Sequence, residues 1–365
     1  MQRCVNVIGV GMSPFRPARV YPDMDDLVGA TARQALVDAG LPASSLTSIY
    51  AASDLPQGAT LQRALDRCGM QGVALRHEFP DHTDNSLVLA CAHQAILAGQ
   101  AEAILVLGVQ GQGTVLPAVE PMGIAARAYM ARYQARRETF AMIAVKARQH
   151  AAYNPQAAFS QLMTLEQVLE APMLAEPLTR PQWAWPTVGV AAVVLCSGEF
   201  ARRQGSGPLV RTLGQACVSP RQVLGAELAS PFAETGYDIH VAAARELYEQ
   251  TGRGPEDIAV CELHDSSTLN ELLLYEALGL CCEGSAEKLV EEGDNTYGGN
   301  LVVNPGGGLL SLGQAGAASA LAQCIELVQQ LRGNAGRRQV ANARIALQHQ
   351  AGPDGTVITT LYQRD

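Results

Sequence analysis

Two histidines occupy positions where a polar side chain could meet a substrate. His82 lies in the segment PDHTDNS, just before a pattern that predicts a helix, and His264 follows a short apolar strand pattern. A histidine at a helix N-terminus tends to stay neutral, because the field of the helix opposes a positive ring. A neutral imidazole can accept a proton near pH 7. We therefore expect His82 and His264 to be catalytic, and a purely structural role for His82 is the alternative.

Further polar groups could stabilise or move charge. Tyr297 in GDNTYGG offers a phenol that is either an acid/base group or a structural hydroxyl in a glycine-rich turn. Fixed hydrogen-bond donors aimed at a developing negative oxygen stabilise it strongly. The side-chain amide of Gln314 and the backbone N–H groups of Gly307 and Gly308 are candidate donors. Asp265 is expected to orient the ring of His264 or to cap the next helix.

The elements that must position these groups repeat along the chain. Helix and strand patterns alternate, which predicts an α/β protein with a largely parallel sheet. The helix pattern Asp23–Ala39 is stopped by Gly40 and leads to a strand, and the pattern Tyr237–Thr251 is stopped by Gly252 and does the same. We predict duplicated βαβαβαββ halves in a five-layer αβαβα arrangement. An ordinary doubly wound domain followed by a second domain is the alternative.

Two small-residue helices are expected at the centre. The patterns Asp84–Ala98 and Gln314–Leu331 are rich in alanine, and a helix buried between two sheets must be slim. The predicted strands are Val5–Val10, Ile49–Ser53, Ala103–Val109, Val190–Cys196, Ile258–Leu263, Arg344–Gln348 and Thr356–Tyr362.

A long segment interrupts the first half. Residues 112–187 separate two of its strands, whereas the matching connection in the second half is the tight loop 350–355. Such excursions usually form a lid or a substrate-binding subdomain. We predict an N-terminal half from residues 1–111 plus 188–204, a loop subdomain from 112–187, and a C-terminal half from 205–365.

Two stretches carry a family resemblance. The text NTYGGNLVVNPGGGLLSLGQAGAASALAQCIELVQQLRG at 295–333 resembles the C-terminal motif region of thiolases of the sterol-carrier-protein type, a lipid-transfer-protein-like branch. The text ELHDSSTLNELLLYEALGLC at 262–281 resembles their His-Asp motif. This resemblance implies the thiolase fold with a loop-domain insert, in agreement with the predicted duplication.

The same resemblance implies that the usual catalytic groups are partly missing. The position of the nucleophilic cysteine falls on His82, and Cys91 lies more than two helical turns further on, as a core thiol. The activating Gly-His-Pro histidine is replaced by Gln314, and an amide cannot act as a base. The last loop lacks a cysteine and offers only Asp354 and the preceding His349. The histidine of the His-Asp motif is kept as His264.

Without a nucleophilic thiol, an acyl-enzyme intermediate is not expected. A thioester enolate could still form, which favours a carbon–carbon lyase that performs retro-aldol cleavage of a β-hydroxyacyl-CoA with a branched or steroid side chain. The sequence is similar to thiolase-like aldolases of steroid side chains, which implies a small partner with an OB-fold and a zinc ribbon. The alternatives are a non-catalytic thiolase-like subunit, and an acyltransferase that uses Ser86 or a partner's thiol.

Composition limits the remaining classes. The net charge is −9 with no basic run, which argues against nucleic acid as a partner. Only 17% of residues are charged, which suits a homodimer or hetero-oligomer. No stretch is predicted to span a membrane, the N-terminus lacks signal-peptide features, and the scattered cysteines suit a reduced, cytoplasmic protein without a metal site. No nucleotide motif is present, so we expect a CoA thioester as substrate and no tightly bound cofactor.

Overall fold

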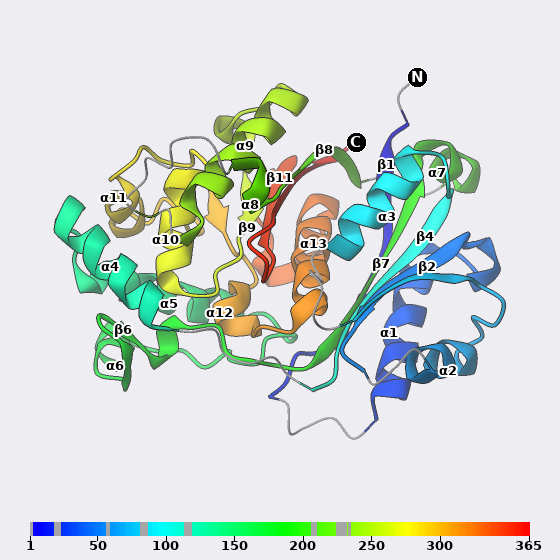
Figure 1. The fold of residues 1–365 in the computed structure, drawn as a ribbon, viewed down its shortest axis with the longest axis horizontal. Coiled ribbons are helices and arrows are strands. Elements are labelled where there is room, and N and C mark those ends of the chain that lie inside the picture. The colour runs from blue at the N-terminus through cyan, green and yellow to red at the C-terminus, as the bar shows by residue number, and fades with distance from the viewer. Residues whose placement is uncertain are drawn as a thin grey trace.

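The chain folds as two similar halves that enclose a pair of helices (Figure 1). The computed structural model describes residues 3–17, 23–55, 59–80, 87–112, 119–205, 210–223, 232 and 235–365. The first half contains β1 (Val5–Met12), α1 (Met24–Ala39), β2 (Ser48–Ser53), α2 (Ala59–Arg67), β3 (Leu75–Pro80), α3 (Leu87–Leu97), β4 (Ala103–Gln110), β7 (Gly189–Ser197) and α7 (Gly198–Gln204).

The second half repeats this order of elements. It contains β8 (Val210–Val218), α8 (Pro220–Val223), α9 (Tyr237–Thr251), β9 (Val260–Glu262), α10 (Thr268–Ala277), α11 (Ala286–Glu291), β10 (Val302–Val303), α12 (Gly308–Leu312), α13 (Gly316–Arg332), β11 (Ile345–Ala351) and β12 (Val357–Arg364).

The strand order confirms the predicted duplication. The described strands form one sheet in the order β10-β9-β11-β12-β8-β1-β7-β4-β2-β3. In each half the inner strand is parallel to its two neighbours, β2 to β3 and β4 and β9 to β10 and β11. The other described pairs are antiparallel, so the sheet is mixed and the expectation of a largely parallel sheet is wrong. A short ladder between β1 and β8 joins the two halves edge to edge.

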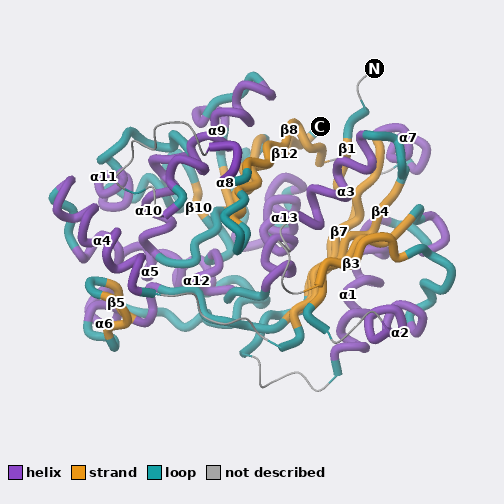
Figure 2. Tube along the Cα trace, viewed as in Figure 1, coloured by secondary structure: helices purple, strands orange, loops and turns teal. Residues whose placement is uncertain are grey.

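The layers follow the predicted αβαβα order. Helix α1 covers β1 and β7 from outside, while α9 covers β8 and β12. Helix α13 lies between the two halves of the sheet and contacts β4 and β7 on one side and β9 and β11 on the other, as Figure 2 shows. A Cβ atom on Gly108 of β4 would lie 2.6 Å from the backbone of Ala317, so a larger residue would push α13 away. The central helix must therefore be slim, as its alanines predict.

The insert packs against the second half. It contains α4 (Glu120–Tyr133), α5 (Arg137–Ala151), α6 (Leu165–Leu169), β5 (Met173–Ala175) and β6 (Leu178–Thr179), all within the span predicted for the loop subdomain. Helix α5 contacts α10, α11 and α12. Buried residues of the insert, such as Phe140 and Trp183, share one apolar cluster with Leu272 and Leu310 of the second half.

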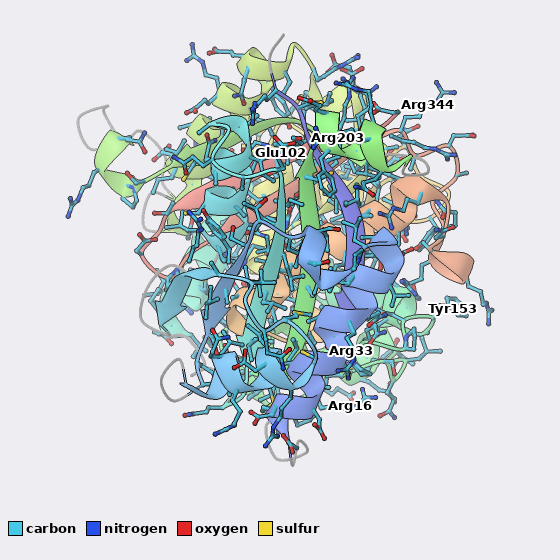
Figure 3. The ribbon with its side chains drawn as sticks, turned by 90° about the vertical axis from the view of Figure 1, so that its right-hand side faces the viewer. Arg16, Arg33, Glu102, Tyr153, Arg203 and Arg344 are labelled. Atoms are coloured by element: carbon cyan, nitrogen blue, oxygen red, sulfur yellow. The ribbon has the colours of Figure 1, made fainter. Side chains whose placement is uncertain are left out.

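The predicted elements differ from the observed ones mainly at their ends. The strand predicted over Ile258–Leu263 is shorter, because only Val260–Glu262 pair with neighbouring strands. The helix predicted from Gln314 begins at Gly316, because Gln314 is held in a bridge to Pro186. At the end of the first half, Arg203 lies 3.0 Å from Glu102, and Figure 3 shows these two side chains together.

Candidate active site

His264 lies where two parallel strands of the second half end. It follows β9 in the loop before α10, and β11 runs parallel beside β9. The residue is half-buried. Burial of its surroundings lowers the pKa of His264 to about 4, so the ring is neutral at pH 7. Such a ring can donate one N–H to a substrate oxygen.

Asp265 serves a different element from those we predicted. Its carboxyl group accepts the backbone N–H groups of Leu309 at 2.7 Å and Leu310 at 3.2 Å, in the first turn of α12. Burial, with the nearby charge of Glu271, raises the pKa of Asp265 well above its usual range. The prediction that it caps the next helix is wrong, because Ser267 caps α10. Asp265 instead holds α12 in place, and both of its oxygens are used there.

The glycines at 307 and 308 are needed for close packing of α12, and the structure gives less support for their predicted role in an oxyanion hole. The N–H of Gly307 donates to the carbonyl of Asn304 at 2.9 Å, so this predicted donor is already occupied. Gly307 has a φ of 99°, and a Cβ atom there would lie 2.7 Å from that of Ala151. A Cβ atom on Gly308 would lie 2.2 Å from a carboxyl oxygen of Asp265. Both glycines therefore allow α12 to approach its neighbours closely.

Tyr297 lies in a separate part of the second half. Its hydroxyl lies 2.7 Å from the carbonyl of Arg338 and 3.2 Å from that of Pro305, to which it can donate its proton. Burial raises the pKa of Tyr297. Its ring packs edge-on against His150, with the ring centroids 4.8 Å apart. These contacts account for the phenol as a structural group, and no described contact joins it to His264.

Gln314 is positioned by the last residues of the insert. Its backbone N–H donates to the carbonyl of Trp185 at 2.8 Å, and its carbonyl accepts the N–H of Thr187 at 3.0 Å. Thr187 also packs against Gly313, where a Cβ atom would lie 2.2 Å from it. The backbone of Gln314 is thus fixed two residues before the start of α13, and its side chain is an amide. It can donate or accept a hydrogen bond but cannot take a proton.

The two polar candidates of the last loop have different surroundings. Asp354 accepts the backbone N–H of Thr356 at 2.8 Å and its hydroxyl at 2.9 Å, so it forms the turn. His349 is fully buried, and its Nε2 lies 3.0 Å from Nδ1 of His240 on α9. The sequence analysis missed His240, because a histidine within an amphipathic helix pattern carries no signal of a partner elsewhere in the chain.

The remaining predictions concern cysteines, metals and the segment before α3. Cys91 packs against the central apolar core, which confirms it as a core thiol. No group of metal-binding side chains occurs within the described residues. His82, Ser86 and the rest of residues 81–86 lie outside the described part of the chain. The described helices include none long and apolar enough to cross a membrane.

Comparison with known proteins identifies the relatives of this arrangement. Residues 230–361 match the family described as Thiolase C-terminal domain-like. Human sterol carrier protein 2 is 36% identical over 403 residues, covering 99% of this chain and 72% of that protein. The chain belongs to the sterol carrier protein 2-type thiolase family. This finding confirms the resemblance and the fold inferred from the sequence.

Two further relatives illustrate the range of this family. The benzoylsuccinyl-CoA thiolase subunit BbsB of Thauera aromatica is 33% identical, covering 96% of this chain and 95% of that subunit. The solved structure of an Ltp2-ChsH2(DUF35) aldolase superposes with a TM-score of 0.83 at 23% identity, covering 99% of this chain and 98% of that chain. At that identity the second comparison supports the fold.

Proposed function

We propose that the protein is a carbon–carbon lyase that acts on an acyl-CoA thioester without forming an acyl-enzyme. The observation that carries this proposal is that one segment of the insert bridges both to Ser267, three residues after His264, and to Gln314. His264 is a neutral hydrogen-bond donor after the end of β9, and Gln314 lies just before α13, where a proton acceptor would be needed to activate a thiol. A site of this kind can stabilise an enolate but cannot generate a thiolate nucleophile.

The proposed reaction is retro-aldol cleavage of a β-hydroxyacyl-CoA. A base removes the hydroxyl proton, the Cα–Cβ bond breaks, and an aldehyde or ketone leaves. The electron pair of the broken bond forms a thioester enolate, whose oxygen accepts the N–H of His264 and the amide of Gln314. The enolate carbon then recovers the proton from the base. His82 remains our candidate for that base.

The relatives support this proposal and suggest an assembly. One structural neighbour is named as an aldolase with ChsH2(DUF35), so we propose a small partner chain of that type. The branched or steroid acyl-CoA substrate that we propose is the one implied by the resemblance of the sequence. A homodimer or hetero-oligomer would follow. The name of the Thauera relative, a thiolase subunit, favours a second candidate: a thiolase-like subunit that binds acyl-CoA and supports a catalytic partner.

A cleavage assay tests the proposal. The full chain, alone and co-expressed with a DUF35-type partner, is given branched and steroid β-hydroxyacyl-CoA substrates. We expect release of a carbonyl product, reduced about 100-fold or more in His264→Ala, because loss of one oxyanion donor typically costs that much. His93→Leu, which changes a buried histidine of α3, is the matched control and should retain activity.

Two results would decide against this function. Thiolysis of a 3-ketoacyl-CoA, with a protein-bound acyl group detected by mass spectrometry, would show an atypical nucleophile. An absence of turnover together with co-purification of an active thiolase would favour the subunit.

A further inference from the structure

The turn that carries His264 is closed by a backbone hydrogen bond across it. The N–H of Asp265 donates to the carbonyl of Leu263 at 3.0 Å, so His264 is the central residue of a three-residue turn. Leu263 and Asp265 are both fully buried, whereas His264 is half-buried. The two ends of the turn are therefore anchored in the protein interior, and the histidine is the accessible residue of the three.

Strand β9 ends before this turn, which leaves the backbone of Leu263 without strand partners. The parallel pairing of β9 with β11 ends at Glu262, and its pairing with β10 ends at Cys261. A buried N–H or C=O group without a hydrogen bond is costly, so the polar groups of Leu263 need partners from elsewhere. Two side-chain amides, from separate parts of the second half, hydrogen-bond these groups.

Asn304 supplies the acceptor. Its Oδ1 accepts the backbone N–H of Leu263 at 2.7 Å, and its own backbone N–H donates to the carbonyl of Cys261 at 2.8 Å. The residue is fully buried and has a φ of 51°, in the left-handed region that asparagine tolerates. Its Nδ2 donates to Glu271 at 3.0 Å, and Glu271 forms an ion pair with Lys146 of the insert. The amide of Asn304 is thus held by hydrogen bonds at both of its ends.

Gln323 supplies the donor. It lies on α13, is 3% exposed, and its Nε2 donates to the carbonyl of Leu263 at 2.9 Å. This carbonyl therefore accepts two N–H groups, one from the turn itself and one from the central helix. Because α13 packs on strands of both halves, the bond ties the turn to the best-supported helix of the fold.

We propose that Gln323 and Asn304 are positioning residues that form a clamp on Leu263 and thereby fix where the ring of His264 meets the substrate. Both act on the backbone just before the histidine, so loss of either lets the turn shift while the imidazole itself is unchanged. A displacement of about 1 Å at a reacting group can cost about 100-fold in rate. The consequence for catalysis rests on the proposed function, whereas the geometry of the turn does not.

Two glutamine variants of the same helix test the clamp. Gln323→Met keeps the length of the side chain and removes its amide. Gln330→Met is the matched control, because Gln330 is also a buried glutamine of α13, but its Nε2 donates to Glu326 and to the carbonyl of Arg338. Hydrogen exchange at the N–H of Asp265 is followed by NMR in the full chain. We expect about fivefold faster exchange in Gln323→Met and a change below about twofold in Gln330→Met, since only the first variant loses a hydrogen bond to the turn.

A variant of the other amide repeats the test from the opposite side of the clamp. Asn304→Gly tolerates the left-handed backbone and removes the acceptor, so the N–H of Leu263 should exchange about fivefold faster or more. Urea denaturation of all three variants corrects the exchange rates for any change in overall stability.

The cleavage assay tests whether the clamp acts through His264. Gln323→Met should lower kcat by about tenfold or more while KM stays within about threefold, and Gln330→Met should keep kcat within about twofold of the wild type. In the His264→Ala background, Gln323→Met should lower kcat by less than about twofold, because the ring that the clamp positions is already absent. A merely structural role would give the same loss in both backgrounds.

Either of two results would overturn the proposal. Exchange at Asp265 and Leu263 could stay at the wild-type rate in Gln323→Met and Asn304→Gly. Alternatively, Gln323→Met could lower kcat equally with and without His264. If the wild-type protein cleaves no substrate, the proposed function fails, and hydrogen exchange still decides whether the clamp holds the turn.

Discussion

A buried histidine of the central helix α3 leads to a quantitative prediction about acid stability. His93 is 6% exposed, its Nδ1 has no hydrogen-bond partner among the described residues, and burial lowers its pKa to about 4. In the unfolded chain the same ring has a pKa of about 6.5. The unfolded state therefore binds more protons than the folded state between these two values, and acidification favours unfolding. The stability that comes from keeping the ring neutral is fully present above pH 6.5 and is lost as the pH falls toward 4.

The size of this effect follows from the two pKa values. At pH 7.5 both states are neutral, so proton binding contributes almost nothing to the free energy of unfolding. At pH 5.0 the unfolded ring is charged and the folded ring is not, which costs about 2 kcal/mol of stability. His93→Leu removes this cost. Relative to the wild type, the variant should therefore gain about 2 kcal/mol between pH 7.5 and pH 5.0.

Urea denaturation at the two pH values measures this difference. The change in packing caused by leucine is the same at both pH values, so only the pH-dependent part is tested. Gln94→Leu, an exposed change on the same helix, is the control and should show the same offset from wild type at both pH values. The reasoning is refuted if the stability of His93→Leu relative to wild type changes by less than about 0.5 kcal/mol between them.

Three further predictions concern the site and its supports. His82→Cys should not acquire thiolase activity in a thiolysis assay, because glutamine at the start of α13 cannot activate the new thiol. Gly308→Ala should lower the free energy of unfolding by about 1–3 kcal/mol in thermal unfolding, because its Cβ would overlap the carboxylate of Asp265. In the control Gly333→Ala the new Cβ meets no described atom within 4 Å, so the loss of stability should be smaller. Lys146→Met leaves the fully buried Glu271 without its ion-pair partner and should cost about 3–5 kcal/mol in urea denaturation, and adding Glu271→Gln should recover part of that loss.

Local patterns predicted most elements, since their signals lie within short segments. The helix predicted over Tyr237–Thr251 has those bounds in the structure, because Gly252 adopts the left-handed conformation that ends it. The start of α13 was predicted two residues too early, because the hydrogen bonds of Gln314 to the insert cannot be read from its own neighbours. Strand β9 is shorter than its apolar run, because the pairing of Val260–Glu262 with β10 and β11 cannot be read from the run itself.

The candidate site was predicted only in part. The strand end and the family resemblance located His264, and the same resemblance located Gln314. The role of Asp265 was missed, because its partners in α12 lie 44 and 45 residues away in the chain. The contact between His240 and His349 spans 109 residues and joins a helix to a strand, so no local pattern reports it.

The position of α13 between the two halves has a consequence for how such proteins change their chemistry. The helix belongs to the second half, but it packs on strands of both halves. Gln314, two residues before the helix, hydrogen-bonds the insert of the first half. Substitutions within the helix are therefore limited by its packing against both halves, whereas position 314 carries glutamine where the family resemblance implies a histidine. Catalytic groups at that point can be exchanged one at a time while the scaffold stays the same. The packing of α13 thus restricts the residues of the helix itself more than the type of residue at position 314.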